Sequence, residues 1–302
     1  MDIFVPNAKI EKFSSADEAL AATTHLAVSA HEDDIEFMAY DGILKCYNSV
    51  NGQGKTGIQG RFSTQKPEVN SFTAVVMTDG AGSPRDGKYA NCTDEEMKAI
   101  RKEEQKKAAE IGKYGALVFA DLPSSQVKDI SDRTAVETLK DIIAKTRPSV
   151  IYSHNPADKH DTHVATVMNL IKALRELEYL PDEFYGCEVW RSLDWVCDSE
   201  KLSFDVGGNS DLERGILEVF DSQIAGGKRY DLAVMGRRRA NATFSESHGV
   251  DKADEVIYAV DLLPLLKDKS LSVAEYMQGF IERFKADVTG RIGKFEVSQA
   301  RK

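Results

Sequence analysis

Short apolar runs alternate with longer amphipathic stretches along the first half of the chain. The apolar runs predict four strands, at residues 25–30, 71–78, 115–120 and 149–153. Helical patterns lie between them, at residues 94–112, 129–145 and 159–178. Thr93, followed by acidic residues, has the sequence signature of a helix N-cap. Because strands separated by helices form βαβ units, we predict an α/β fold with a Rossmann-like, mostly parallel sheet and helices on both faces.

The pattern after residue 181 is less regular. Strands are indicated within 184–195 and at 256–261, and helices at 212–225, 229–241 and 273–285. We expect residues 1–180 to form a metal-binding catalytic core. Residues 181–302 are expected to form a C-terminal α+β extension that packs on this core and completes the substrate site, within one compact domain. The segment 51–70, rich in Gly, Lys and Gln, is predicted to be an exposed loop or hairpin.

Composition and charge exclude several classes of protein. Of the 302 residues, 42% are hydrophobic, which supports a packed core and argues against disorder. A formal charge of −10 disfavours a nucleic-acid partner, because an acidic surface repels phosphate. No apolar run approaches the roughly 20 residues of a membrane span, and residues 1–13 lack the pattern of a secretory signal. The four cysteines have no CxxC spacing, so we expect reduced thiols in a cytoplasmic protein.

Ionisable side chains follow each predicted strand. They are His31, Asp33 and Asp34 after the first strand, Asp79 and Gly80 after the second, Asp121 after the third, and His154, Asp158, His160 and His163 after the fourth. In parallel α/β sheets, functional sites form outside the carboxyl ends of the strands. The sequence therefore predicts that these side chains gather around one site.

Two of these clusters have the spacing of metal ligands. His31 and Asp34 are three residues apart on a strand-to-helix turn, and zinc accepts both imidazole nitrogen and carboxylate oxygen. His160 and His163 share one helix face. Each cluster alone also fits a plainer structural role, as a helix N-cap or a solvated helix start. Together they predict a catalytic zinc site, in which three protein ligands and a water equip the protein for hydrolysis.

These motifs resemble those of the PIG-L/LmbE family of zinc-dependent N-deacetylases, which includes the deacetylases of mycothiol and bacillithiol synthesis. The family motif Ala-His-Pro-Asp-Asp-Glu reads Ala30-His31-Glu32-Asp33-Asp34-Ile35 here, and His-Pro-Asp-His reads His160-Asp161-Thr162-His163. Thr78-Asp79-Gly80 is similar to the family's strand-end loop, and Arg101 to Glu104 is similar to its Arg-x-x-Glu helix. With weaker late features at 221–223 and 249–255, the resemblance covers residues 25 to 257 approximately.

The resemblance implies a role for each residue of the paired motifs. His31, Asp34 and His163 would bind one zinc ion per chain. Asp33 would be the general base that takes a proton from the metal-bound water. His160, as an imidazolium, would stabilise the oxyanion of the tetrahedral intermediate or protonate the leaving amine.

The resemblance also implies the substrate. It would be an N-acetylated amino sugar of the N-acetylglucosamine type, or a conjugate of it, from which the enzyme removes the acetyl group. Arg101, Asp79 and Gly80 would contact this substrate. The plainer alternatives are that Arg101 pairs with Glu104 on a surface helix and that Asp79 and Gly80 only form a tight turn.

The sequence departs from the family pattern at several positions of the motifs, among them Ile35, which stands where the family often has Glu and is not a ligand position. Glu32 replaces a Pro that is not a ligand. Thr162 replaces an Asp that tunes the imidazole of His160, although Asp158 or Asp161 could substitute for it. Loss of that Asp leaves open a metal-dependent sugar-binding protein without turnover. Because His/Asp sites also serve phosphate, a metal-dependent phosphoesterase is a second alternative. Homo-oligomer formation is also left open.

Overall fold

A computed structural model describes residues 1–6, 13–51 and 69–299 of the chain. Its centre is an eight-stranded sheet with the strand order β1-β4-β3-β2-β5-β6-β8-β7. The strands are β1 (Asp2–Phe4), β2 (His25–Ser29), β3 (Phe72–Thr78), β4 (Ala116–Leu122), β5 (Val150–His154), β6 (Glu183–Cys187), β7 (Leu202–Asp205) and β8 (Val256–Asp261). Residues 52–68, which make up most of the predicted loop or hairpin, lie outside the described residues.

The five strands from β2 to β6 are parallel to their neighbours, which confirms the predicted α/β fold. At the centre, β2 pairs with both β3 and β5, so that His25 lies opposite Phe72 and Val150. Every residue of β2, β3 and β5 is buried, as expected for strands covered on both faces. The edge strands β1 and β7, and β8 beside β7, pair in the antiparallel direction.

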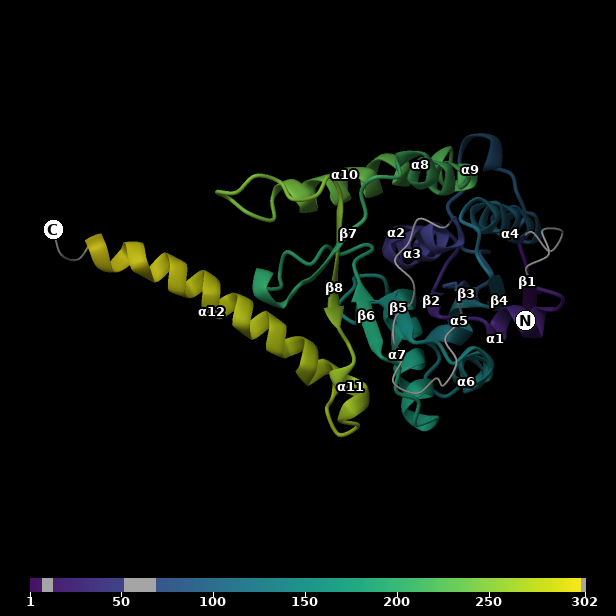
Figure 1. Cartoon of the computed structure of the whole chain (residues 1–302), viewed down its shortest axis with the longest axis horizontal. Helices are drawn as coiled ribbons and strands as arrows, with labels where there is room; N and C mark the ends of the chain where they lie inside the picture. The colour runs from purple at the N-terminus through teal and green to yellow at the C-terminus, as the bar shows by residue number, and fades with distance from the viewer. Residues whose placement is uncertain (7–12, 52–68, 300–302) are drawn as a thin grey trace.

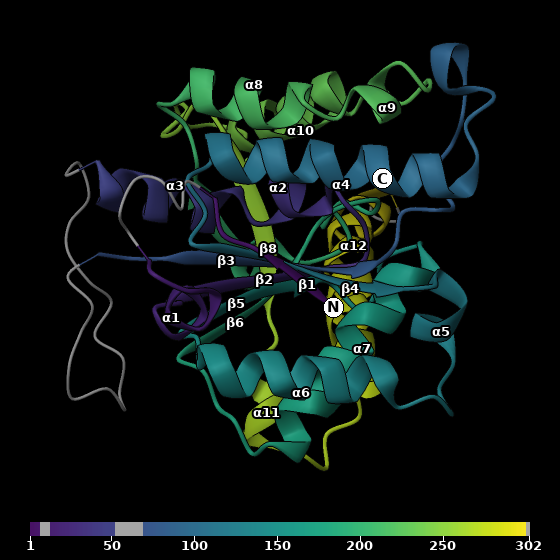
Figure 2. The ribbon, with the colours of Figure 1, turned by 90° about the vertical axis from the view of Figure 1, so that its right-hand side faces the viewer.

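Helices cover both faces of the sheet (Figure 2). One face carries α1 (Ala16–Ala21), α5 (Ser124–Lys128), α6 (Thr134–Thr146), α7 (Asp161–Glu176) and α11 (Pro264–Lys267). The other carries α2 (Asp34–Met38), α3 (Tyr40–Val50) and α4 (Asp94–Ile111), with α8 (Ser210–Glu218), α9 (Asp221–Ile224) and α10 (Tyr230–Thr243) as a further layer above them. Short 3₁₀ turns form η2 (Gly87–Tyr89) and η3 (Asp198–Glu200).

The alternation of side chains along β2 explains the two hydrophobic layers. Leu26 and Val28 point to the face covered by α6 and α7, whereas Ala27 points to the face covered by α2 and α3. The carboxyl end of the same strand leads directly into α2. The sheet therefore holds the segment that begins at His31 between two packed layers.

The helix predicted at 129–145 begins later in the structure. The chain instead forms α5 and then α6, which starts at Thr134. Asp129 accepts hydrogen bonds from the backbone N–H and the hydroxyl of Ser131, and Asp132 accepts one from the backbone N–H of Thr134. These side chains form turns that compete with helical hydrogen bonds, which ends one helix and starts the next.

The second half of the chain continues the same sheet. Of the predicted strand region 184–195, only β6 joins the sheet, and β8 coincides with the predicted strand 256–261. The edge strand β7 was not predicted, because it is only four residues long and its burial alternates. Helix α8 lies against α4, and α10 lies against β8.

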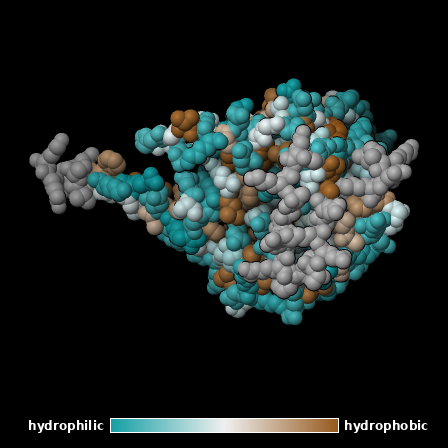
Figure 3. All heavy atoms as spheres, in the orientation of Figure 1, coloured by the Kyte–Doolittle hydropathy of each residue, from teal (hydrophilic) through white to brown (hydrophobic). Residues whose placement is uncertain are grey.

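The C-terminal helix α12 (Val273–Gln299) is longer than the predicted 273–285. Val273, Met277 and Phe280 bury its first turns against the body, and the rest projects away from it (Figure 1). The face shown in Figure 3 is largely hydrophilic, including much of this projecting part. Among the described residues, none of the helices has the length and apolar content that crossing a membrane requires.

Candidate metal centre

The turn between β2 and α2 presents two adjacent carboxylates in different directions. Asp33 has a φ of 88°, in the left-handed region that few residues other than glycine adopt. Asp34 begins α2, and its Oδ2 accepts the backbone N–H of His31 at 2.8 Å. The backbone therefore turns sharply at Asp33, which separates the side chain of Asp33 from the side chains of His31 and Asp34.

His31, Asp34 and His163 bring three donor atoms together. His31 Nδ1 lies 3.1 Å from Asp34 Oδ2 and 3.1 Å from His163 Nε2, and the third edge, His163 Nε2 to Asp34 Oδ2, is 3.3 Å. Donors about 2.0–2.2 Å from one tetrahedral ion lie roughly 3.3–3.6 Å apart. The triangle is within a few tenths of an ångström of that size, so these three residues fit a zinc ion.

His154 offers a second ligand set, with Asp34 and His163. Its Nε2 lies 3.6 Å from Asp34 Oδ2, but the same nitrogen accepts the backbone N–H of Ala30 at 2.9 Å. Because that bond occupies the nitrogen lone pair, Nε2 is not free to bind a metal. The ring of His154 also stacks on that of His163, with centroids 3.9 Å apart. His154 thus supports the centre by packing, and the first triangle is the better ligand set.

Asp158 orients His163. Asp158 Oδ2 lies 3.3 Å from His163 Nδ1, and the same oxygen accepts the backbone N–H of Trp190 at 3.2 Å. A carboxylate on the far nitrogen fixes the ring and directs its other nitrogen to a metal. The sequence suggested Asp158 or Asp161 as a substitute partner of His160, whereas the structure pairs Asp158 with His163.

Mutual electrostatics hold the ligand carboxylate ionised. Burial raises the pKa of Asp34, but the imidazoles of His163, His31 and His154 outweigh it and hold this pKa well below its usual range. Burial lowers the pKa of His163, yet Asp34 and Asp158 raise it to about 9. The centre therefore binds a proton on His163 tightly, and a metal ion would have to displace that proton.

Asp33 is held by Arg101 and Gln105. Arg101 Nη1 and Nη2 lie 3.4 Å and 3.3 Å from Asp33 Oδ2, and the backbone N–H of Asp33 donates to Gln105 Oε1 at 3.1 Å. Burial raises the pKa of Asp33 well above its ordinary value, although Arg101 opposes the shift. A carboxylate with a raised pKa that is held in place has the properties of a general base.

Arg101 lies deeper than the sequence indicated. It is 2% exposed, and its guanidinium contacts the backbone carbonyl of Glu32 and the carboxylates of Glu32 and Glu104. The alternative, in which Arg101 pairs with Glu104 on the protein surface, is therefore wrong, because the pair is buried. Arg101 lines the same cavity as Asp33, so it can contact a substrate as well as position the carboxylate.

His160 is close to the triangle but has no carboxylate on its ring among the described residues. Its ring stacks on that of His163 at 4.6 Å and meets that of His31 edge-on at 4.9 Å. Burial, together with these two imidazoles, lowers the pKa of His160 to about 4. Thr162 is buried, and its hydroxyl lies 3.3 Å from that of Ser124. With no proton partner, His160 is neutral at pH 7.

Asp79 and Gly80 form the opposite wall of the cavity. Asp79 accepts the backbone N–H of Ala81 at 3.2 Å and lies 3.1 Å from Lys98 Nζ. Gly80 has a φ of +73°, and an added Cβ would lie 3.0 Å from both carboxylate oxygens of Glu32. Only glycine fits there, so both residues serve the turn and line the cavity at the same time.

The cavity that these residues share has a volume of about 310 Å³. Its lining includes His31, Asp33, Asp34 and His160, and thus the open side of the triangle. Residues from the second half of the chain complete it, namely Trp190, Gln223, Lys228 and Tyr230. The sequence did not place these four at the site, although Gln223 lies in the late family feature 221–223, because loop and helix patterns do not reveal which side chains reach across to the core.

The fold and this site define an α/β protein with a candidate His/Asp metal centre at the carboxyl edge of a parallel sheet. Residues 56–174 match the family described as "PIG-L: GlcNAc-PI de-N-acetylase". This match agrees with the resemblance drawn from the motifs and confirms it over these residues. His160 and His163 lie within the matched residues, whereas His31 and Asp34 precede them. No curated protein matches the chain significantly in sequence.

Solved structures share this fold at low sequence identity. A conserved protein from Thermus thermophilus superposes with a TM-score of 0.57 and 15% identity, over 80% of this chain and 95% of that one. N,N'-diacetylchitobiose deacetylase from Pyrococcus horikoshii gives 0.56 and 17%, over 78% and 83%. 4-Carboxy-2-hydroxymuconate hydratase from Pseudomonas putida gives 0.55 and 18%, over 80% and 96%. The last two catalyse different reactions, so the fold alone does not define the chemistry.

Proposed function

We propose that this chain is a zinc-dependent hydrolase that removes the acetyl group from an N-acetylated amino sugar. The observation that carries the proposal is the triangle of His31, Asp34 and His163, which opens into a polar cavity beside Asp33. The match to the PIG-L family over residues 56–174 and the fold shared with a chitobiose deacetylase support the same activity. Zinc bound there would lower the pKa of a water toward about 7 and polarise the amide carbonyl.

The protein's own residues supply the proton transfers and the orientation. Asp33 accepts the proton of the attacking water and returns it to the nitrogen of the leaving amine, and Arg101 holds its carboxylate in place. His160, being neutral, donates an N–H hydrogen bond to the oxyanion rather than a full positive charge. A neutral imidazole thus takes the place of the imidazolium that the family resemblance implies. Asp158 keeps His163 in the orientation of a ligand.

The cavity favours a sugar-sized polar substrate. Besides the metal centre, its lining offers hydrogen-bonding groups from Asp79, Ser124, Thr162 and Gln223. Its volume of about 310 Å³ is at the small end of ligand pockets, which start near 300 Å³. An aromatic wall that includes Trp190 and polar groups around it suit a sugar ring. We therefore expect a monosaccharide unit of the N-acetylglucosamine type to react there.

The test is release of free amine from a panel of N-acetylated sugars, with the purified protein as isolated, after chelation and after zinc is added back. We expect amine release that chelation abolishes and zinc restores. Sugar binding without amine release would favour the non-catalytic sugar-binding protein. Release of phosphate from simple esters would favour the phosphoesterase. Turnover that chelation does not affect would contradict the metal centre.

A further inference from the structure

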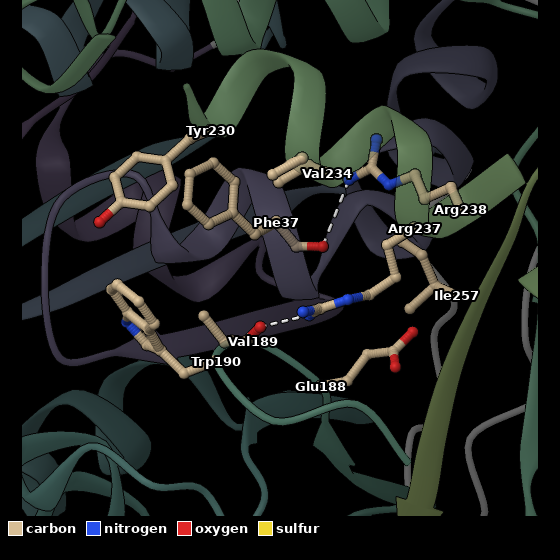
Figure 4. A pocket seen from close by; sticks show the side chains of 10 residues that line it. Phe37, Glu188, Val189, Trp190, Tyr230, Val234, Arg237, Arg238 and Ile257 are labelled. Carbon is tan, nitrogen blue, oxygen red and sulfur yellow. Dashed lines mark hydrogen bonds between the residues drawn. The ribbon is translucent and has the colours of Figure 1, made fainter. Parts of the chain in front are cut away.

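A second cavity adjoins the candidate active site (Figure 4). Its volume is about 150 Å³, and α10 and the segment after β6 form much of its wall. Hydrocarbon dominates the lining, with the aliphatic side chains of Val189, Val234 and Ile257. We call this cavity the annex. Nothing in the proposed deacetylation step uses it.

Three aromatic residues connect the annex to the active-site cavity. Phe37, Trp190 and Tyr230 line both. The ring of Tyr230 lies 5.2 Å from that of Phe37 and 6.0 Å from that of Trp190, between centroids. The ring of Trp190 is in turn 6.3 Å from that of His160. The two cavities therefore adjoin at these rings, and a ligand anchored at the metal centre would have to pass between the rings to enter the annex.

The charged side chains at the wall of the annex are largely paired within the protein: Oε1 of Glu188 accepts from Asn241, while Oε2 of Glu188 and Nε of Arg238 make no hydrogen bond within the part of the chain that the structure describes. The guanidinium of Arg237 donates to the carbonyl of Val189, and that of Arg238 donates to the carbonyl of Phe37 at 3.3 Å (Figure 4). Arg238 also donates to the carboxylate of Glu213 at 2.5 Å. Because these donors are engaged, a ligand in the annex would meet mainly apolar surface.

We propose that the annex binds an apolar substituent of the substrate with about the size of a benzene ring or a six-carbon chain. An apolar cavity of about 150 Å³ is large enough to bind benzene. This inference rests on the proposed function, because it assumes that the amide reacts in the adjoining cavity. The same chemistry can come from either side of the amide, as an aglycone on the sugar or as a longer acyl group.

Binding can be tested separately from turnover. Trp190 is one of two tryptophans, so Trp195→Phe leaves it as the sole indole fluorophore beside the annex. The titrants are two series on glucosamine: alkyl glycosides of the N-acetyl sugar from methyl to octyl, and N-acyl sugars from acetyl to octanoyl. We expect affinity to rise about fourfold per methylene, the equivalent of ~0.8 kcal/mol, in one series and to level off near six carbons. The series that responds identifies the source of the apolar group.

Variants on α10 locate the effect. Val234→Phe fills the annex and should abolish the dependence on chain length, and Ala233→Leu serves as a milder second filling variant if the first is unstable. Leu232→Phe is the matched control, because Leu232 is on the same helix, 58% exposed and outside the annex. The control should keep the full dependence on chain length.

The outcomes separate the two proposals. Flat affinity in both series, or an unchanged chain-length dependence when the annex is filled, would overturn the annex proposal even if acetyl groups are released. A chain-length dependence that the filling variants remove would support the annex even if no amine is released, and in that case only the proposed activity would fail.

Discussion

One histidine begins strand β2 and another follows its end, and the two differ in burial and in the groups that they contact. His25 begins the strand and is fully buried, whereas His31 follows its end and has a side chain that is 24% exposed. His25 Nδ1 lies 2.9 Å from the Thr24 hydroxyl and 3.5 Å from the thiol of Cys46. His31 Nδ1 instead lies between a carboxylate and another imidazole.

The difference shows what distinguishes a functional histidine from a structural one. Burial, with a smaller effect of Lys45, lowers the pKa of His25 to about 3, so this histidine is a neutral part of the core. At the other end, several donors converge on one point that faces a cavity. Convergence and access identify the site; a perturbed pKa alone does not.

The largest expected effect comes from the metal ligands. His163→Ala should reduce the bound metal from about one ion per chain to a small fraction, because it removes one of three ligands and leaves only His31 and Asp34. His25→Gln, at the other end of β2, should retain the metal. Elemental analysis of both variants after gel filtration measures this. Equal metal content in the two variants would show that His163 is not a metal ligand.

Asp33→Asn should keep the metal and slow turnover by about 10²–10⁴-fold, the usual contribution of a general base. Asn tolerates the left-handed backbone of this position, so the fold should persist. The measurement is kcat for release of free amine, together with metal content. A variant that turns over at the wild-type rate would remove Asp33 from the mechanism.

A third prediction concerns stability in acid. The pKa of His25 is about 3 in the folded protein and about 6.5 when unfolded, so its contribution is complete above pH 6.5 and is lost as pH falls toward 3. Between pH 7 and pH 5 the loss of this contribution lowers the free energy of unfolding by about 2 kcal/mol. Urea unfolding at both pH values should show a smaller loss for His25→Gln than for wild type. An equal loss would mean that His25 is not buried neutral.

The smallest effect tests whether Arg101 positions Asp33 or binds substrate. Lysine keeps the charge but lacks the fork that reaches both Asp33 and the Glu32 carbonyl. Arg101→Lys should lower kcat about tenfold, in line with other residues that orient a catalytic group, and leave KM nearly unchanged. A rise in KM with constant kcat would instead assign Arg101 to substrate binding.

The sequence predicted the elements that form the site well. The apolar runs 25–30, 71–78 and 149–153 correspond closely to β2, β3 and β5, because fully buried parallel strands are continuous hydrophobic stretches. The carboxyl-end rule then placed His31 and His163 at one edge before any distance was known. Local pattern and one topological rule were sufficient for this part.

The partners of the site residues were harder to predict. The pairings of Asp158 with His163 and of Arg101 with Asp33 depend on how α7 and α4 are oriented on the sheet, and spacing along the chain does not determine this. The same holds for the annex, since α10 joins the wall of the site from the last third of the chain. Contacts between elements distant in sequence require the packed structure.

The left-handed backbone at Asp33 has an evolutionary consequence. A non-glycine residue there stores strain, and glycine would relieve it. Selection for stability alone would therefore remove the carboxylate, while selection for turnover retains it. A descendant of this protein that had lost its reaction would drift toward glycine at position 33 and become more stable, so the identity of that one residue in a relative reports whether the chemistry is still under selection.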